Sequence, residues 1–161
     1  SRFKTYLSQA LNKPQSDIHA MVIGGHGDTT MIPLMRLASY NGIPITKLLS
    51  NENQNKVVSS TMIGGATLTK LLGTSAWYAP GASVSYLVDS ILNNKKKVIP
   101  CSAYLDGQYG LRDICIGVPV IIGKNGIEEI IDLDLNSSEK NMLHESAKAI
   151  ASMNKSLKNF I

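Results

Sequence analysis

The sequence predicts an α+β domain in which long helices pack on an antiparallel sheet, and three observations lead to this fold class. Two long segments carry apolar residues at helical spacing, at 54–72 and from residue 136 onward. Between them, two strand-like segments precede a Gly-Lys-Asn-Gly turn and a third follows it. The chain has 161 residues, of which 43% are hydrophobic and 17% charged, and it contains no repeat or linker. These values are typical of one folded domain with its own core.

The first forty residues combine a helix with short extended segments. Apolar residues on one face predict a helix that ends before Pro14: Phe3, Tyr6, Leu7, Ala10 and Leu11. Residues 20–23 form an apolar strand, residues 29–35 are extended, and Asn41-Gly42 is a turn. Because no residue ahead of the first helix can cap it, we expect further sequence upstream of Ser1.

The central region is expected to hold two helices. The first covers about 54–72 through these positions: Val57, Val58, Thr61, Met62, Gly65, Leu68, Leu71 and Leu72. Glycine costs helix stability, so the pair Gly64-Gly65 predicts that another backbone approaches this helix closely. Ala79-Pro80-Gly81 interrupts the chain and can begin the second helix. The apolar face of that helix would comprise Val84, Leu87, Val88, Ile91 and Leu92.

The last third predicts three strands and a final helix. The strands are Val98–Leu105, Ile114–Ile122 and Ile127–Ile131, and the Asn-Gly turn within 123–126 makes the last two an antiparallel hairpin. The helix begins near Asn136, with Glu139 at capping-box distance. Its buried stripe would comprise Leu143, Ala147, Ile150, Ala151, Leu157 and Ile161.

Composition favours a globular protein that works in the cytoplasm, away from membranes and nucleic acids. No apolar run approaches the roughly 20 residues that span a bilayer, and no apolar leader is present. The net charge of +4 is scattered apart from Lys95-Lys96-Lys97, which we interpret as a solvated loop. Cys101 and Cys115 could form a disulfide, but two buried thiols in a reducing cytoplasm are the favoured interpretation.

The segment Gly24-Gly25-His26-Gly27-Asp28-Thr29 is the most informative about function. A predicted strand ends there, and three glycines surround one histidine. Glycines allow unusual backbone angles and leave no side chain to block access to the ring. An imidazole has an ordinary pKa of about 6.5 and therefore exchanges protons near neutral pH. We predict that His26 is functional, against the alternative of a turn histidine without a role.

Arg2 is the second candidate. Its guanidinium presents a planar pair of donors that matches a carboxylate, although spacing alone favours a surface arginine. Arg2-Phe3 followed by GGHGDT from Gly24 resembles the lactate and malate dehydrogenase family, in which an Arg-Phe pair precedes the catalytic histidine by a near-fixed interval. Here 24 positions separate Arg2 from His26, which agrees with that interval.

The similarity extends through GTSAWYAPGAS at 73–83 and GVPVIIGKNGIEEII at 117–131, so that it covers essentially the whole chain. One departure is an added threonine, since the commoner family form runs GGHGDT directly into Met-Val-Pro. The addition follows His26 and leaves its interval from Arg2 intact. It puts only the pairing of the next short strand in question.

The resemblance implies that residues 1–161 are the C-terminal substrate-binding and catalytic domain of an NAD-dependent dehydrogenase. The N-terminal Rossmann domain, the mobile loop and the aspartate that pairs with the histidine would lie outside this chain, which contains no GxGxxG after a strand. His26 would give a proton to the keto oxygen while NADH supplies a hydride to the same carbon, and Arg2 would hold the substrate carboxylate.

The resemblance also assigns residues of the 74–80 segment. Ser75 and Ala76 would lie beside the substrate and Pro80 beside the nicotinamide ring, although an ordinary helix start explains these residues equally well. Trp77 and Tyr78 suit a core or an interface as well as a site. We interpret Asp28 as a structural loop residue, because the family pairs the histidine with the aspartate outside this chain.

The Gly-Gly before His26 and AWYAP at 76–80 resemble the malate branch, which makes malate and oxaloacetate the expected substrates. Lactate and pyruvate remain the alternative, since the group that reads the second carboxylate lies on the mobile loop. Family members are usually homodimers or tetramers, and the helix at 54–72 could contribute to such an interface.

Two rival interpretations come from other classes. A metallohydrolase could use His26 and Asp28 as ligands, but a metal site needs three or four ligands, and His19 and His144 stand at no ligand spacing, so we expect no metal. A non-catalytic assembly domain is the second rival. For the chain alone, without a cofactor domain, we expect negligible dehydrogenase activity.

Overall fold

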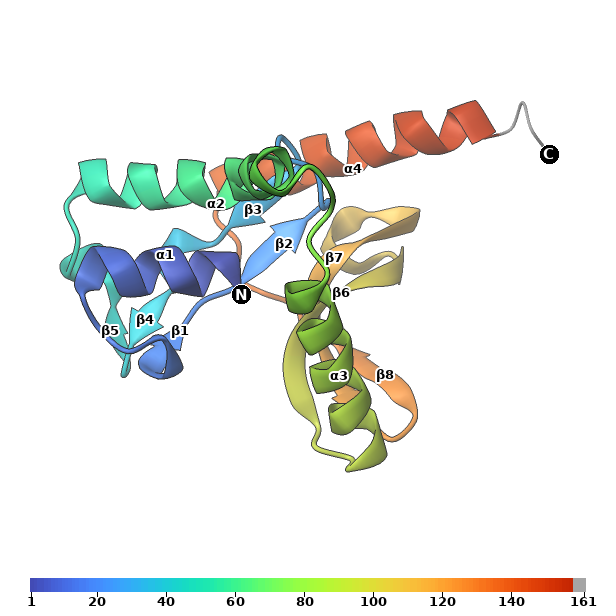
Figure 1. Cartoon of the computed structure of the whole chain (residues 1–161). Helices are drawn as coiled ribbons and strands as arrows, with labels where there is room; N and C mark the ends of the chain where they lie inside the picture. The colour runs from blue at the N-terminus through green and yellow to red at the C-terminus, as the bar shows by residue number, and fades with distance from the viewer. Residues whose placement is uncertain (158–161) are drawn as a thin grey trace. The chain divides into compact units, whose positions relative to one another are not determined.

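The structure is a computed structural model that describes residues 1–157, and the chain forms two compact units (Figure 1). The first unit comprises residues 1–22 and 33–79, and the second comprises residues 23–32 and those from 80 onward. Each unit combines helices with antiparallel strands. The predicted α+β class with antiparallel sheets is therefore confirmed.

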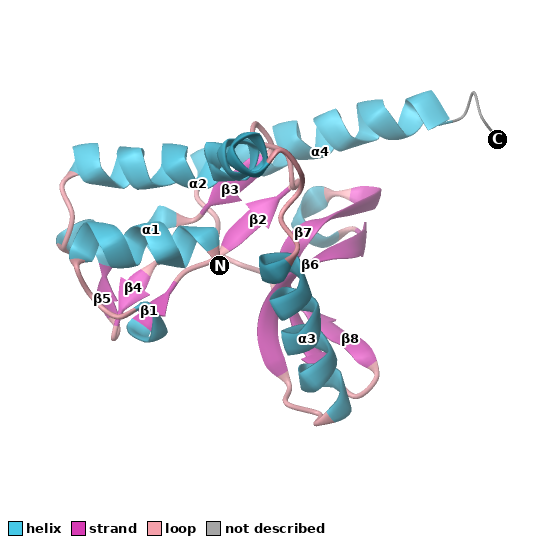
Figure 2. Ribbon diagram, in the orientation of Figure 1, coloured by secondary structure: helices cyan, strands magenta, loops and turns pink. Residues whose placement is uncertain are grey.

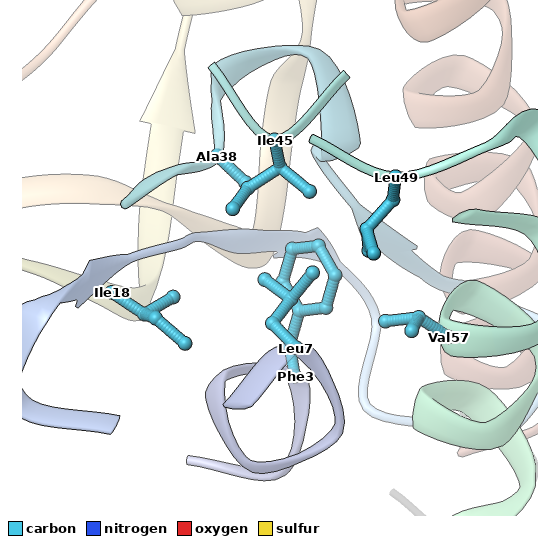
Figure 3. Close-up of a cluster of buried hydrophobic side chains, with 7 residues drawn as sticks. All are labelled: Phe3, Leu7, Ile18, Ala38, Ile45, Leu49 and Val57. Carbon is cyan, nitrogen blue, oxygen red and sulfur yellow. The ribbon is translucent and has the colours of Figure 1, made fainter. Parts of the chain in front are cut away.

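The core of the first unit lies beneath α1 (Arg2–Leu11), which packs against α2 (Asn51–Leu72). The predicted apolar face of α1 places Phe3 and Leu7 in this core, each at most 2% exposed. Figure 3 shows the cluster that they form with residues of the following segments: Phe3, Leu7, Ile18, Ala38, Ile45, Leu49 and Val57. Burial of each such side chain stabilises the fold by about 1.5–3 kcal/mol relative to leaving it exposed, so this unit has a core of its own.

A small sheet accompanies this core. Its strands are β1 (Ile18–His19), β4 (Ser39–Tyr40) and β5 (Ile43–Pro44), paired antiparallel in the order β1-β4-β5. The predicted Asn41-Gly42 turn joins β4 to β5, with φ of +45° and +83°, which suits a two-residue hairpin loop. Three short 3₁₀ helices lie in the same unit, at Gln15–Asp17, Met35–Leu37 and Ile45–Lys47.

Helix α2 begins at Asn51, three residues before the predicted start. Ser50 caps it, since its Oγ accepts a hydrogen bond from the backbone N–H of Asn53 at 3.3 Å. Gly73, with φ of +69°, ends it in a left-handed conformation. The first half of the predicted stripe is buried at Val57 and Thr61, whereas the second half is exposed at these positions: Leu68, Leu71 and Leu72.

The larger sheet has β7 (Arg112–Gly123) at its centre (Figure 2). Strand β7 pairs antiparallel with β6 (Lys97–Asp106), with β8 (Gly126–Ile130) and, at Gly117, with Gly24 of β2 (Val22–Gly24). Strand β3 (Met31–Pro33) is the outer neighbour of β2. The predicted hairpin is confirmed, because Gly123 pairs with Gly126 across the turn.

Helix α4 (Ser137–Leu157) packs on β7, and it begins with the predicted capping box. The backbone N–H of Glu139 donates to Asn136 Oδ1, and the backbone N–H of Asn136 donates to Glu139 Oε2, both at 2.9 Å. Leu143 and Ala147 of the predicted stripe are buried. Leu157 is wrong as a stripe residue, because it is 55% exposed near the end of the described helix, and Ile161 lies outside the described residues.

Helix α3 (Tyr78–Leu92) has a partly covered apolar face. Leu87 and Ile91 are partly buried, whereas these residues of the same predicted face are exposed: Val84, Val88 and Leu92. Within residues 1–157, none of the helices combines the length and apolar character that crossing a membrane requires.

Both cysteines are free thiols, as favoured, but only Cys101 is partly buried. The expectation of burial was wrong for Cys115, which is exposed because side chains alternate across a strand and its neighbours Ile114 and Ile116 take the buried face of β7.

Candidate active site

His26 lies on the loop of residues 25–30 that joins β2 to β3. Gly24, the last residue of β2, precedes the loop, and its φ of +86° is a left-handed conformation that favours glycine. A side chain there would also place a Cβ 2.5 Å from the carbonyl oxygen of Thr30. His26 itself is exposed, and within residues 1–157 no hydrogen bond reaches its ring. The loop therefore presents an imidazole that is open to a ligand.

Thr30 occupies the inside of this loop. Its Oγ1 accepts a hydrogen bond from the backbone N–H of Gly27 at 3.0 Å. A Cβ at Gly25 would lie 2.5 Å from this Oγ1, and a Cβ at Gly27 would lie 3.0 Å from it. The sequence suggested that these glycines keep the histidine ring accessible, and the structure adds a second reason, which is that they leave room for the threonine.

A tight turn closes the loop on its far side. The backbone N–H groups of Thr30 and Met31 both donate to the carbonyl oxygen of Gly27, each at 3.1 Å. Asp28 is exposed in this turn. Strand β3 begins at Met31, directly after the threonine, and lies beside β2, which answers the question of strand pairing that the added threonine raised.

Ser146 of α4 joins the two ends of the loop, a role that no sequence motif predicted. Its Oγ accepts a hydrogen bond from the backbone N–H of Gly25 and donates one to the carbonyl oxygen of Thr30, both at 2.8 Å. A signal was present, because Ser146 is a polar residue next to Ala147 and three residues after Leu143, on the buried stripe of the helix.

Arg2 is held against α2 in the first unit. Its Nη1 donates to the carbonyl oxygen of Thr61 at 3.1 Å. A Cβ at Gly65 would lie 3.0 Å from this Nη1, and one at Gly64 would lie 2.9 Å from the hydroxyl of Tyr6. The atoms nearest to the glycine pair belong to two side chains of α1, the helix that packs against α2. The pair thus fixes where the guanidinium lies.

The other predicted site residues lie around the connection from α2 to α3. Ser75 is exposed and Ala76 is partly buried, and both belong to the first unit together with Arg2. Pro80 is exposed in the first turn of α3 and belongs to the second unit together with His26. Trp77 and Tyr78, left open between core, interface and site, are 70% and 91% exposed, which excludes the core of this chain.

The sheets of residues 1–157 differ from the parallel sheet of a dinucleotide-binding fold. A fold that binds NAD across its sheet uses parallel strands with helical crossovers, whereas every strand pair between residues 1 and 157 with a defined register is antiparallel.

His19 belongs to the first unit and His144 to the second. His19 is exposed at the end of β1, and the Nε2 of His144 lies 2.9 Å from the carbonyl oxygen of Tyr109, on the second unit. In the described part of the chain, no group of three or more His, Cys, Asp or Glu side chains is arranged to hold a metal ion.

Comparison with known proteins gives the family to which this fold belongs. Residues 1–161 match the family model described as lactate/malate dehydrogenase, alpha/beta C-terminal domain, and the chain belongs to this family. It is 68% identical over its full length to malate dehydrogenase of Flavobacterium frigidimaris, of which it covers 52%. Over 98% of its length it is 62% identical to malate dehydrogenase of Bacteroides thetaiotaomicron, of which it covers 50%. The chain thus spans about half the length of these relatives.

Solved structures confirm the fold. Malate dehydrogenase of Cryptosporidium parvum superposes with a TM-score of 0.95 at 38% identity, covering 98% of this chain and 52% of that one. Lactate dehydrogenase of Eimeria maxima, with NADH and oxamate, superposes with a TM-score of 0.94 at 40% identity, covering 99% and 51%. The likeness extends to both branches of the family.

Proposed function

We propose that this chain is the C-terminal, substrate-binding and catalytic part of an NAD-dependent malate dehydrogenase. In the full-length enzyme, an N-terminal NAD-binding domain precedes it. Two observations support this: relatives with 62–68% identity are named malate dehydrogenase and are about twice as long, and the long strands β6 and β7 pair antiparallel, unlike the parallel strands of a dinucleotide-binding fold. The enzyme is proposed to be a homo-oligomer, as the family resemblance implies, and to work in the cytoplasm, as the composition favours.

His26 is proposed to carry the proton of the reaction. In the direction of reduction, the protonated imidazole gives its N–H proton to the keto oxygen of oxaloacetate, so that an O–H bond forms as the N–H bond breaks. NADH, held by the N-terminal domain, would supply the hydride for the new C–H bond, so that the products would be malate and NAD⁺. In the reverse direction, the neutral ring takes the hydroxyl proton. The observation that carries this proposal is the exposed His26 ring on a loop whose backbone is tied down on both sides.

Arg2 is proposed to bind the substrate carboxylate that both branches share. A guanidinium has five N–H donors, and the hydrogen bond to Thr61 uses one of them, at Nη1. The remaining donors suit a carboxylate, and their fixed plane orients it. Ser75 and Ala76 are proposed to line the substrate, and Pro80 the nicotinamide ring.

Lactate dehydrogenase is the alternative, because the Eimeria maxima enzyme shares the fold at a TM-score of 0.94. We favour malate because the relatives above 60% identity carry that name. Comparison of kcat/KM for oxaloacetate and pyruvate in the full-length enzyme separates the two, and a higher value for pyruvate would replace malate by lactate.

The test of the catalytic role is His26→Asn in the full-length enzyme, followed by NADH oxidation with oxaloacetate. We expect kcat to fall by about 10²–10⁴, the usual contribution of general acid–base catalysis, while NADH binding measured by fluorescence is unchanged. His19→Asn is the matched control, since His19 is also exposed, and it should retain full activity. An active His26→Asn enzyme, or one that has lost NADH binding, would remove His26 from this role.

A further inference from the structure

We propose that Ser146 is a positioning residue that fixes the loop carrying His26. The inference rests on the proposed function, because it assigns to Ser146 the task of aiming the proton donor. Ser146 lies on α4, 121 and 116 positions along the chain from the two loop residues that it binds.

The geometry places the Ser146 hydroxyl at the point where the loop closes. The loop ends are joined by a backbone hydrogen bond from the N–H of Gly25 to the carbonyl oxygen of Thr30, at 3.1 Å. Ser146 Oγ binds the same two groups more closely, at 2.8 Å each. A hydroxyl can donate one hydrogen bond while it accepts another, which is what bridging an N–H and a carbonyl oxygen requires.

Packing leaves little freedom at this point. Ser146 is 4% exposed. A Cβ at Gly24 would lie 3.1 Å from its Oγ, and a Cβ at Gly25 would lie 3.4 Å from the Cδ1 of Ile150 on the next turn of α4. The helix therefore approaches the loop through Ser146 and Ile150, and only glycine fits at residues 24 and 25.

The hydrogen bond from the Gly25 N–H to Ser146 affects His26, because Gly25 directly precedes His26 in the chain. If the Gly25 peptide turns, the Cα–Cβ bond of His26 turns with it, and the exposed ring has no hydrogen bond of its own to restore its direction. The contacts made by the Thr30 side chain and by the far turn are internal to the loop. Ser146, by contrast, ties the loop to α4, which is packed on β7.

A second buried serine shows what a merely structural hydroxyl looks like. Ser90 of α3 is fully buried, and its Oγ donates to the carbonyl oxygen of Tyr86, four residues earlier in its own helix, at 2.8 Å. Such a bond satisfies the hydroxyl without involving another segment. Ser146 instead bonds to residues 121 and 116 positions away, so its hydroxyl serves the loop.

The experiment compares Ser146→Ala with Ser90→Ala in the full-length enzyme. Each variant loses one buried serine hydroxyl of the same unit. We expect Ser146→Ala to lower kcat by about 10- to 100-fold, the scale of a misplaced catalytic group, with the KM for NADH unchanged. Ser90→Ala should leave kcat unchanged. Equal losses of kcat in the two variants, or no loss in Ser146→Ala, would overturn the proposal.

A readout without turnover separates this inference from the proposed function. The imidazole signals of His26 and the hydrogen exchange of the Gly25 amide are followed by NMR, and we expect Ser146→Ala to broaden or shift the former and to speed the latter. If His26→Asn is fully active but these signals still respond to Ser146→Ala, the proposed function fails and the positioning stands. Unchanged signals overturn the positioning.

Thr30→Val is the second variant, for use if Ser146→Ala does not fold. It keeps the shape of Thr30 but removes the hydroxyl that accepts from the Gly27 N–H. The carbonyl oxygen that Ser146 binds is retained, so we expect a smaller loss of kcat, about 3- to 10-fold, and the same response of the His26 signals. Wild-type kcat and wild-type signals in this variant would contradict the idea that a fixed loop aims the ring.

Discussion

Gly65 sets the position of Arg2, and this can be tested by adding one methyl group to α2. In a helix interior, Gly→Ala ordinarily stabilises by about 1 kcal/mol. Here the new Cβ would lie 3.0 Å from Nη1 and 3.3 Å from Nη2 of Arg2. Contacts of this kind are comfortable at about 3.5 Å, so the guanidinium must move, and its hydrogen bond to Thr61 is strained or lost.

Two costs oppose the gain in helix stability and decide whether Gly65→Ala raises or lowers the free energy of unfolding. Overpacking costs about 1–3 kcal/mol, and a lost hydrogen bond costs about 0.5–1.5 kcal/mol. Part of this combined cost is recovered because the Arg2 side chain is flexible and only partly buried. Against the helix gain, we expect Gly65→Ala to lower the free energy of unfolding by about 1 kcal/mol. In an Arg2→Ala background the obstacle is absent, and the same change should raise it by about 1 kcal/mol.

Urea unfolding of the chain, followed by circular dichroism, measures all four corners of this cycle. The expected coupling of about 2 kcal/mol lies well above the scatter of additive sites. Gly81→Ala is the control, since no atom lies within 4 Å of a Cβ at that position of α3, and it should stabilise equally in both backgrounds. If Gly65→Ala stabilises the chain whether or not Arg2 is present, the glycine pair has another purpose.

Two further predictions concern the second unit. The Tyr109 hydroxyl donates to the carbonyl oxygen of Ile131 and accepts from the N–H of Leu133, so Tyr109→Phe should cost about 1–3 kcal/mol in urea unfolding. Burial raises the pKa of the Tyr109 hydroxyl in the folded chain. The unfolded chain therefore ionises first, and the free energy of unfolding should fall as pH rises past about 10. If the Tyr109→Phe variant shows the same fall as the wild type, Tyr109 is not its cause. Burial also raises the pKa of the Cys101 thiol, whereas Cys115 is exposed; iodoacetamide at pH 8 should therefore label Cys115 first by peptide mapping, and faster labelling of Cys101 would be inconsistent with this arrangement.

Much of the fold could be predicted from the sequence because its signals are local. The Asn-Gly hairpin and the capping box of Asn136 and Glu139 need only a few neighbouring residues, and both form as expected. The two-residue strands of the small sheet are too short for an alternating pattern. The predicted burial of Leu157 was wrong, because helical periodicity tells which residues share a face of the helix but not how far the surface that covers this face extends.

In the candidate site, too, the local features could be predicted from the sequence and the long-range contacts could not. His26 could be found because its glycines adjoin it in the sequence. The contacts of Arg2 with Thr61 and of the loop with Ser146 join residues 59 and more than 100 positions apart, and no spacing rule reaches that far. The sequence marks the pair Gly64-Gly65 as a place of close packing, but which atoms pack there depends on how α1 lies against α2.

The bridge between the loop and α4 has a consequence for anyone who recombines these enzymes. A crossover placed between residues 30 and 146 would take the Gly25 and Thr30 backbone groups from one parent and the hydroxyl that joins them from the other. Where the second parent carries a side chain without a hydroxyl at this helix position, the hybrid lacks the two hydrogen bonds that join the loop to α4, although every local motif is preserved. Exchanging the two segments together keeps the set intact.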